Sequence, residues 1–192
     1  MTESENFDTR NSVQLSIAKQ FTADVMWTHK VHEKQAEIYF GYHECLYWID
    51  VCLSFVTACG VFALARNLLP CYQWLIELLS IITSVLATGF AIFIKHCDFC
   101  NQARQHKSAA VRFLGIRNRL YQIVGDFRSG NRPIEDIRAE FAQIRETTQA
   151  LYELVPQTTP KALAKAETAL KTKKESSYSQ VELNALLPEY LR

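Results

Sequence analysis

Two carboxylates stand inside apolar stretches of this 192-residue chain, where a charged side chain is costly. Asp50 lies in the apolar run 45–65, and Glu77 lies in the apolar run 74–94. A carboxylate at mid-membrane costs ~2.5–3.5 kcal/mol on insertion scales. Because rings of acidic side chains that face water within a membrane favour cations, the first chemistry that these residues suggest is the passage of a cation.

Small polar residues follow each carboxylate at helical spacing. Ser54 and Thr57 come four and seven residues after Asp50, which places all three on one helical face. A second face carries Glu77, Ser80, Ser84 and Thr88, together with Ala87 and Ala91. Such residues either line a wetted path or let helices pack closely, and both alternatives fit the sequence. Glu77 also stands close enough to the end of its run to extend toward an interface.

Other reactive side chains do not form a recognisable catalytic or metal motif. Cys97 and Cys100 have the spacing of a zinc-binding pair, but no second Cys or His pair accompanies them, so surface thiols without a metal are predicted. His29, His32 and Glu33 share a helical face that we expect to be solvated. The sequence has no glycine-rich phosphate loop and no nucleophile elbow. It therefore predicts a protein that is not an enzyme and needs no cofactor.

The elements that position the two carboxylates are the apolar runs themselves. Each run has 21 residues, enough for a helix to cross a ~30 Å hydrocarbon core. Aromatic side chains mark the ends, with Tyr47 and Trp48 at one edge and Tyr72 and Trp74 at the other. We predict an all-α membrane protein whose transmembrane hairpin is continuous with antiparallel cytoplasmic helices. The competing interpretation is a soluble bundle with two buried helices.

Basic residues around the runs predict the orientation in the membrane. Outside the connecting segment the flanks carry Lys30, Lys34, Lys95, Arg104, Lys107 and Arg112. The connecting segment 66–73 carries Arg66 alone. By the positive-inside rule both termini are expected in the cytoplasm. The formal net charge of +1 gives no indication of direct nucleic-acid binding.

Two heptad seams follow the second run. The first contains Ala109, Phe113, Ile116, Leu120, Ile123 and Phe127, and the second contains Ile134, Ile137, Phe141, Ile144, Thr148, Leu151 and Val155. A break at 129–133 with Pro133 separates them, so an antiparallel helix pair is predicted. Because such seams bind other helices, they are candidates for oligomerisation. The candidate residues are Phe113, Ile116, Leu120, Ile123, Ile137, Phe141, Ile144 and Leu151.

The predicted organisation has five parts. Residues 1–12 are expected to be disordered, and 13–44 form a cytoplasmic helix. Residues 45–94 form the transmembrane hairpin, with spans 45–65 and 74–94. Residues 95–155 form the cytoplasmic helical hairpin. Residues 156–192 hold a short helix that Thr159 caps, followed by a tail.

The order of these parts resembles a known family. A polar helix carries Trp27-Thr28-His29-Lys30, two spans follow, and a long helix carries Ala109-Ala110 and the stretch from Phe113 to Arg119-Leu120-Tyr121. Over residues 12–155 this resembles the SLATT proteins, bacterial two-transmembrane effector domains found beside nucleotide second-messenger synthases and nucleotide-sensing domains.

The resemblance implies a function in antiphage defence at the bacterial inner membrane. Such an effector oligomerises on a signal, permeabilises the membrane, and arrests or kills the host cell. A nucleotide-signal synthase, a reverse transcriptase or another defence protein is the expected partner. The alternative is a membrane-anchored scaffold or sensor subunit that recruits a soluble partner through its cytoplasmic helices.

Overall fold

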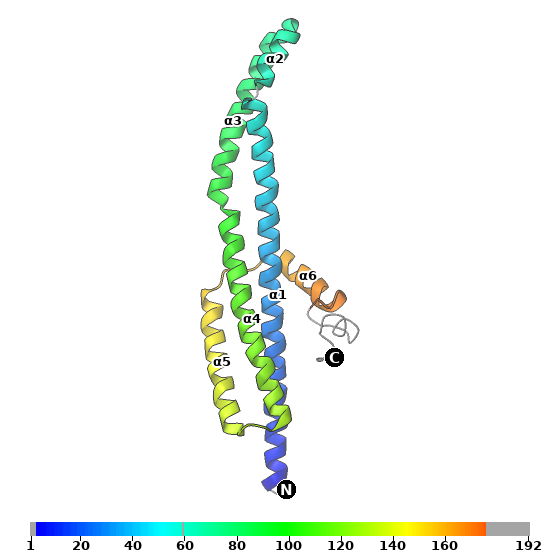
Figure 1. Cartoon of the computed structure of the whole chain (residues 1–192), viewed down its shortest axis with the longest axis vertical. Coiled ribbons are helices and arrows are strands. Elements are labelled where there is room, and N and C mark those ends of the chain that lie inside the picture. Colours follow the sequence, from blue (N-terminus) through cyan, green and yellow to red (C-terminus); the bar gives the residue numbers. More distant parts are fainter. Residues whose placement is uncertain (1–2, 59, 176–192) are drawn as a thin grey trace, which may run out of the picture. The chain divides into compact units, whose positions relative to one another are not determined.

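Every secondary-structure element in the described part of the chain is a helix. The computed structural model describes residues 3–58 and 60–175. Its elements are α1 (Glu3–Ala58), α2 (Val61–Leu68), a 3-10 turn η1 (Pro70–Tyr72), α3 (Gln73–Cys97), α4 (Phe99–Ser129), α5 (Ile134–Leu154), α6 (Pro160–Glu167) and a π turn η2 (Thr168–Thr172) (Figure 1). The predicted all-α class is confirmed.

The outer boundaries differ from the predicted ones. Helix α1 begins at Glu3, whereas the periodic pattern predicted a start at residue 13. The predicted tail beyond Glu175 lies outside the described residues. The chain divides into two compact units, Met1–Ala36 with Gln105–Arg192 and Glu37–Arg104, which we call the bundle unit and the hairpin unit. The predicted five-part division stays a prediction.

The bundle unit packs three helix segments side by side. Phe113 of α4 contacts Tyr152 of α5, and Arg119 of α4 reaches Glu140 of α5, so these two helices are antiparallel as predicted (Figure 1). On α1, Phe21 packs edge-on against Phe141 with ring centroids 5.8 Å apart. Three helices together enclose an apolar core that two helices alone would leave open.

Both heptad seams close on α1 of the same chain. The buried core contains Ala18, Val25, Phe113, Ile116, Leu120, Ile123, Ile137, Phe141, Ile144 and Leu151. All eight residues that the sequence suggested for oligomerisation therefore lie inside one bundle. Their burial accounts for the two seams without a second copy. A role in oligomerisation stays a prediction, and it would require the bundle to open.

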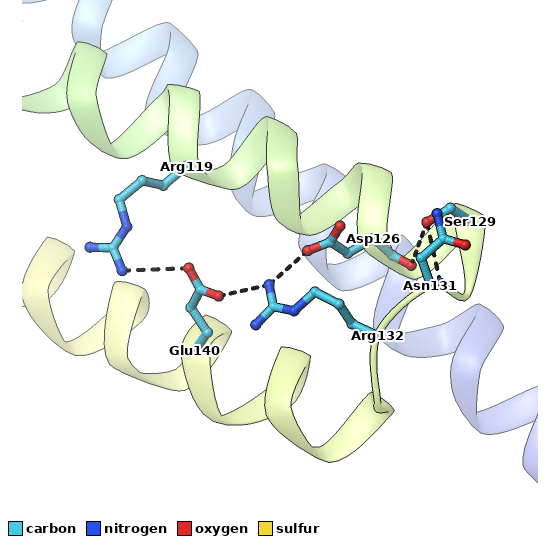
Figure 2. Close-up of polar contacts among 6 residues, drawn as sticks. All are labelled: Arg119, Asp126, Ser129, Asn131, Arg132 and Glu140. Carbon is cyan, nitrogen blue, oxygen red and sulfur yellow. Dashed lines mark hydrogen bonds and ion pairs between the residues drawn. The ribbon is translucent and has the colours of Figure 1, made fainter.

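An ion-pair network fixes the connection between α4 and α5. Gly130 takes a left-handed conformation with φ 65°, which a residue without Cβ adopts without strain. Arg132 Nη1 lies 2.7 Å from Asp126 Oδ2 and 3.0 Å from Glu140 Oε2 (Figure 2). Since Asp126 and Glu140 lie on opposite sides of the turn, Arg132 holds the two helix ends together.

The first apolar run is not one straight helix. Helix α1 ends at Ala58, Gly60 adopts φ 63°, and α2 continues the run to Leu68. The axes of the two helical parts differ by 45°. The predicted single span 45–65 is thus broken at Gly60, because glycine enters the left-handed region without a Cβ clash. Pro70 lies in the turn that follows, as predicted.

A second interruption separates α3 from α4. The sequence predicted that the helix continues past the second apolar run, but Asp98 is left-handed, with φ 43°. Asp98 Oδ1 accepts a hydrogen bond from Asn101 N at 3.3 Å, and Gln102 Nε2 donates to Cys97 O at 2.8 Å. Asp98 therefore begins α4 with its own side chain, as aspartate does at many helix starts.

Replacement of Phe113 by alanine should destabilise the bundle unit. This side chain is fully buried and contacts His32 and Tyr152, so its truncation should lower the free energy of unfolding by ~3–5 kcal/mol. Denaturant unfolding of the full chain in mild detergent, followed by circular dichroism, measures the change. Val111→Ala on the same helix, at an exposed position, is the control and should change stability by less than about 0.5 kcal/mol. Equal losses in both variants would contradict this account of the core.

Candidate functional site

Helix α3 exposes a long apolar surface. The stretch Pro70–Ser129 contains an 18-residue window with mean hydropathy 2.0, and none of that window is buried. The exposed side chains include Leu75, Leu78, Leu79, Ile81, Ile82, Val85, Leu86, Ile92 and Phe93. By length and composition this helix is able to cross a membrane. The first apolar run passes the same test when α1 and α2 are taken together across their bend.

Aromatic side chains lie exposed at both ends of this apolar surface. Tyr47 and Trp48 on α1 pack edge to face with ring centroids 5.8 Å apart. Tyr72 and Trp74 are exposed where α3 begins. Rings that are apolar in body and polar at one edge are enriched at membrane–water interfaces. Their positions agree with the predicted edges of the two spans.

The predicted polar stripes are split between two environments. Between residues 41 and 57 of α1 the half-buried positions are His43, Leu46, Asp50, Val51, Leu53, Val56 and Thr57. On α3, Ile76 is buried, and the half-buried positions are Ser80, Thr83, Ala87, Phe90, Ile94 and Cys97. Asp50, Thr57 and Ser80 thus lie on the faces turned into the hairpin. Ser54, Glu77, Ser84 and Thr88 are exposed.

Helix geometry explains why Ser80, Ser84 and Thr88 do not share one environment. Four residues turn an α-helix by about 400°, so two steps of four carry Thr88 about 80° around the helix from Ser80. The buried and half-buried positions of α3, from Ile76 to Cys97, alternate steps of three and four, which keeps them on one side of that helix. A stripe with steps of four drifts off this seam and reaches the exposed surface.

The hydroxyl groups of the stripes donate to their own helices. Ser84 Oγ donates to Ser80 O at 2.9 Å, and Thr88 Oγ1 donates to Ser84 O at 3.0 Å. Thr57 Oγ1 lies 2.9 Å from Ser54 O and 3.2 Å from Leu53 O. Because the donor hydrogen is used, each oxygen presents its lone pairs outward. This arrangement suits a cation, and it also allows burial against another helix.

Glu77 is paired with a cation of the same unit. Arg66 Nη1 lies 3.2 Å from Glu77 Oε1, and both side chains are about half exposed. The two residues line a cavity of about 400 Å³ with Phe62, Ala63, Ile76, Ser80 and Ile81. The pattern treated Arg66 as a loop charge and missed the pair, because the bend at Gly60 turns α2 toward α3.

Asp50 differs from Glu77 in having no such partner. It is half-buried and forms no hydrogen bond or ion pair with the part of the chain that the structure describes. The hairpin register is set at one end by Tyr42 against Phe99, 5.7 Å between ring centroids, and at the other by Phe62 beside Glu77.

The cysteines near the α3–α4 break are free thiols. Cys97 and Cys100 are half-buried on either side of Asp98. Among residues 3–58 and 60–175 there is no cluster of three or more His, Cys, Asp and Glu side chains able to hold a metal ion. That these two thiols bind no metal stays a prediction from their spacing.

One buried polar cluster was not predicted from the sequence. His32, which the helical pattern placed on a solvated face, is buried in the bundle unit, and this prediction is wrong. Its Nδ1 lies 2.9 Å from Nδ1 of His106 on α4, which is also buried. Burial lowers the pKa of His32 to about 4 and lowers that of His106 as well. The signal in the sequence was the position of His106 one turn before Ala110 on the core-facing side of α4.

Helix α6 is fastened to α1 by polar contacts. Thr159 donates to Gln35 Oε1 from both its backbone N, at 2.9 Å, and its Oγ1, at 2.7 Å. Thr159 Oγ1 also accepts from Ala162 N, which confirms the predicted cap. Further along, Lys30 Nζ lies 2.8 Å from Glu175 Oε2 and 2.8 Å from Glu33 Oε2. Burial alone would lower the pKa of Lys30, but these two hydrogen bonds outweigh it and raise that pKa.

Comparison with known proteins gives one match. The sequence model of the SMODS and SLOG-associating 2TM effector domain family 4 matches residues 15–182. The family resemblance seen in the sequence is thereby confirmed. No curated protein and no solved structure matches the chain.

Loss of the Gln35 side-chain carbonyl should release α6. Gln35 is fully buried, so Gln35→Leu leaves the two Thr159 donors without their acceptor at a cost of ~1–3 kcal/mol. Tryptic cleavage at the exposed Lys161 and Lys165 should accelerate by roughly tenfold, which mass spectrometry of the digest measures. Gln143→Leu, at an exposed position of α5, is the matched control. Unchanged cleavage in Gln35→Leu would show that α6 is held by other contacts.

Proposed function

Because the chain belongs to the SMODS and SLOG-associating 2TM effector domain family 4, we propose that it is a membrane effector that oligomerises and permeabilises the bacterial inner membrane. Family membership indicates a role in antiphage conflict systems and association with a membrane. The loss of the membrane barrier would then arrest growth or kill the infected cell.

The observation that carries this proposal is the exposed apolar surface of α3. Soluble monomers rarely expose contiguous apolar patches above a few hundred Å². Here a window long enough to span hydrocarbon has no buried residue, and exposed aromatic side chains flank it. Lipid is the solvent that such a surface requires. Basic residues are more frequent before the first run and after the second run than in the segment between them, which supports an orientation with both termini in the cytoplasm.

Permeabilisation requires several copies. Two helices cannot surround a water path, and in hydrocarbon every exposed polar group needs a partner. The seams of α4 and α5 are occupied within one bundle, so we propose that assembly uses the hairpin unit. Its exposed Ser54, Ser84 and Thr88 are small enough for close approach of a neighbouring helix.

We propose that Asp50 is the main charged residue lining the assembled path. Glu77 is already neutralised by Arg66, so it adds little net charge where it stands. Asp50 has no counter-ion among the described residues. Thr57 and Ser80 lie on the same inward faces and have hydroxyl oxygens free to accept. A ring of such groups from several copies favours cations over anions.

Removal of this polar face should reduce ion leak. The double variant Asp50→Leu with Thr57→Leu replaces a carboxylate and a hydroxyl of the inward face by apolar groups, so leak from liposomes should fall by roughly tenfold or more. A potential-sensitive dye measures the leak at fixed protein-to-lipid ratio. The matched control is Ile49→Leu with Phe55→Leu, two exposed apolar positions of the same helix. Leak equal to that of the unmodified protein would count against a path through Asp50.

The alternative function is a membrane-anchored scaffold or sensor subunit. The observation that favours it is the separation of the bundle unit as a compact body with its own core. In that case the bundle recruits a soluble defence partner, and the hairpin serves as an anchor.

Exchange of residues 45–94 for an unrelated two-span hairpin separates the two functions. An effector that permeabilises should lose its toxicity in cells, because the polar face is gone. A scaffold should keep its defence activity, because the bundle is unchanged. Membrane flotation of the exchanged protein serves as the control for insertion.

A further inference from the structure

The bundle unit contains two buried histidines that contact each other. His32 on α1 and His106 on α4 are 3% and 2% exposed, and their Nδ1 atoms are 2.9 Å apart. The two rings lie 5.2 Å apart at 32°, and His32 stacks on Phe113 at 5.6 Å and 18°. Two buried imidazoles thus form a polar contact between α1 and α4 beside the Phe113 ring.

This contact exists only while the pair carries no more than one proton on the facing nitrogens. At 2.9 Å one Nδ1 must donate and the other must accept. Protonation of both rings makes both atoms donors and brings two positive charges together at a buried site. The acceptor would be lost and the helices would be pushed apart.

Few acidic side chains lie near the pair to stabilise its protonated form. After burial, the groups that lower the pKa of His32 are the imidazoles of His106 and His29, and burial lowers the pKa of His106. The charged groups around His29 are Glu33 and Lys30 on α1 and Lys107 and Arg117 on α4. The pKa of His29 is itself lowered, first by burial. From α5 the layer receives the Tyr152 ring, which contacts Phe113 and whose hydroxyl lies 3.1 Å from Thr28 Oγ1. The acids of this group are Glu33, whose Oε2 lies 2.8 Å from Lys30 Nζ, and Glu175, whose Oε2 lies 2.8 Å from the same amine.

We propose that the His32–His106 pair is an acid-sensitive latch, which holds α1 against α4 when both imidazoles are neutral and releases them when the pair is protonated. The ligand of this site is the proton. The latch would act on the bundle unit, whose core contains both heptad seams. Release would therefore expose the apolar residues that the closed bundle covers, including Phe113.

The direction of the pH dependence follows from burial. A histidine whose pKa in the folded chain lies below its unfolded value of about 6.5 binds fewer protons in the closed bundle than in the open one. The stabilising contribution is complete above pH 6.5 and is lost as the pH falls toward about 4, where His32 titrates. The bundle is closed near neutral pH and opens in acid.

If the chain permeabilises the membrane as proposed, the latch would make the opening of the bundle respond to pH as well; this consequence rests on the proposed function. An inner membrane that leaks protons acidifies the cytoplasm when the medium is acidic. Acidification would open further bundles, so the first leak would recruit additional copies. The opening of the bundle can be measured without any leak, so the latch stands or falls separately from permeabilisation.

Hydrogen exchange of the full chain in lipid nanodiscs tests the latch. Peptides covering 25–36 and 103–120 should exchange at a rate that, after correction for the intrinsic pH effect, is flat from pH 8 to 7. Below pH 6.5 the open population should rise by roughly tenfold per pH unit for each proton taken up. His106→Asn keeps a polar atom near the Nδ1 position but does not titrate, so its slope should be at most about half as steep.

His96→Asn is the matched control, because His96 is exposed and should leave the slope unchanged. If His106→Asn fails to fold at neutral pH, nitrogen-15 NMR of histidine-labelled unmodified protein decides. The spectrum at pH 5.5 should still contain the signals of neutral imidazoles from His32 and His106. Corrected exchange equal at pH 7.5 and 5, equal flattening by His96→Asn, or five protonated histidines at pH 5.5 would each overturn the proposal.

Discussion

Helix α3 exposes an apolar surface that water solvates poorly. An 18-residue apolar window of this helix has no buried residue, and its length matches a hydrocarbon core. At ~25 cal/mol per Å² of exposed apolar surface, water would be a poor solvent for it. Lipid satisfies this constraint, and the exposed Tyr47, Trp48, Tyr72 and Trp74 mark where lipid would end. The cost of a polar group in the hairpin depends on where that group lies relative to this apolar surface.

The bundle unit solves the opposite problem, because the apolar residues of its two seams are turned inward. Phe113 and Leu120 are fully buried, although the heptad spacing that places them would equally suit contact with a second chain. Helix α1 fills the groove that the α4–α5 pair leaves open. Assembly of several copies would therefore use either the exposed surface of the hairpin unit or the heptad seams of an opened bundle unit. The buried histidine pair makes the second choice dependent on protonation.

The two carboxylates of the hairpin show how neighbours decide a role. Glu77 and Asp50 have the same charge and stand in similar apolar runs, yet Arg66 neutralises Glu77 and leaves Asp50 as the uncompensated charge. The bend at Gly60 brings Arg66 into reach. An electrostatic argument from composition alone would have treated the two acids as equivalent rings of one path.

The sequence by itself determined the helical class, the two apolar runs, both heptad seams, the proline turn and the Thr159 cap, because each is a local property of spacing or of one residue's backbone preference. It also determined the family, because the order of these elements is visible without coordinates. Only the tertiary structure decided what each seam packs on, since a heptad does not specify its partner. The same holds for the Arg66–Glu77 pair, for the fastening of α6 by Gln35, and for the burial of His32 against His106. Each of these contacts depends on how the helices fold back on one another, and the strength of a charge or hydrogen bond depends on the neighbours that folding brings to it.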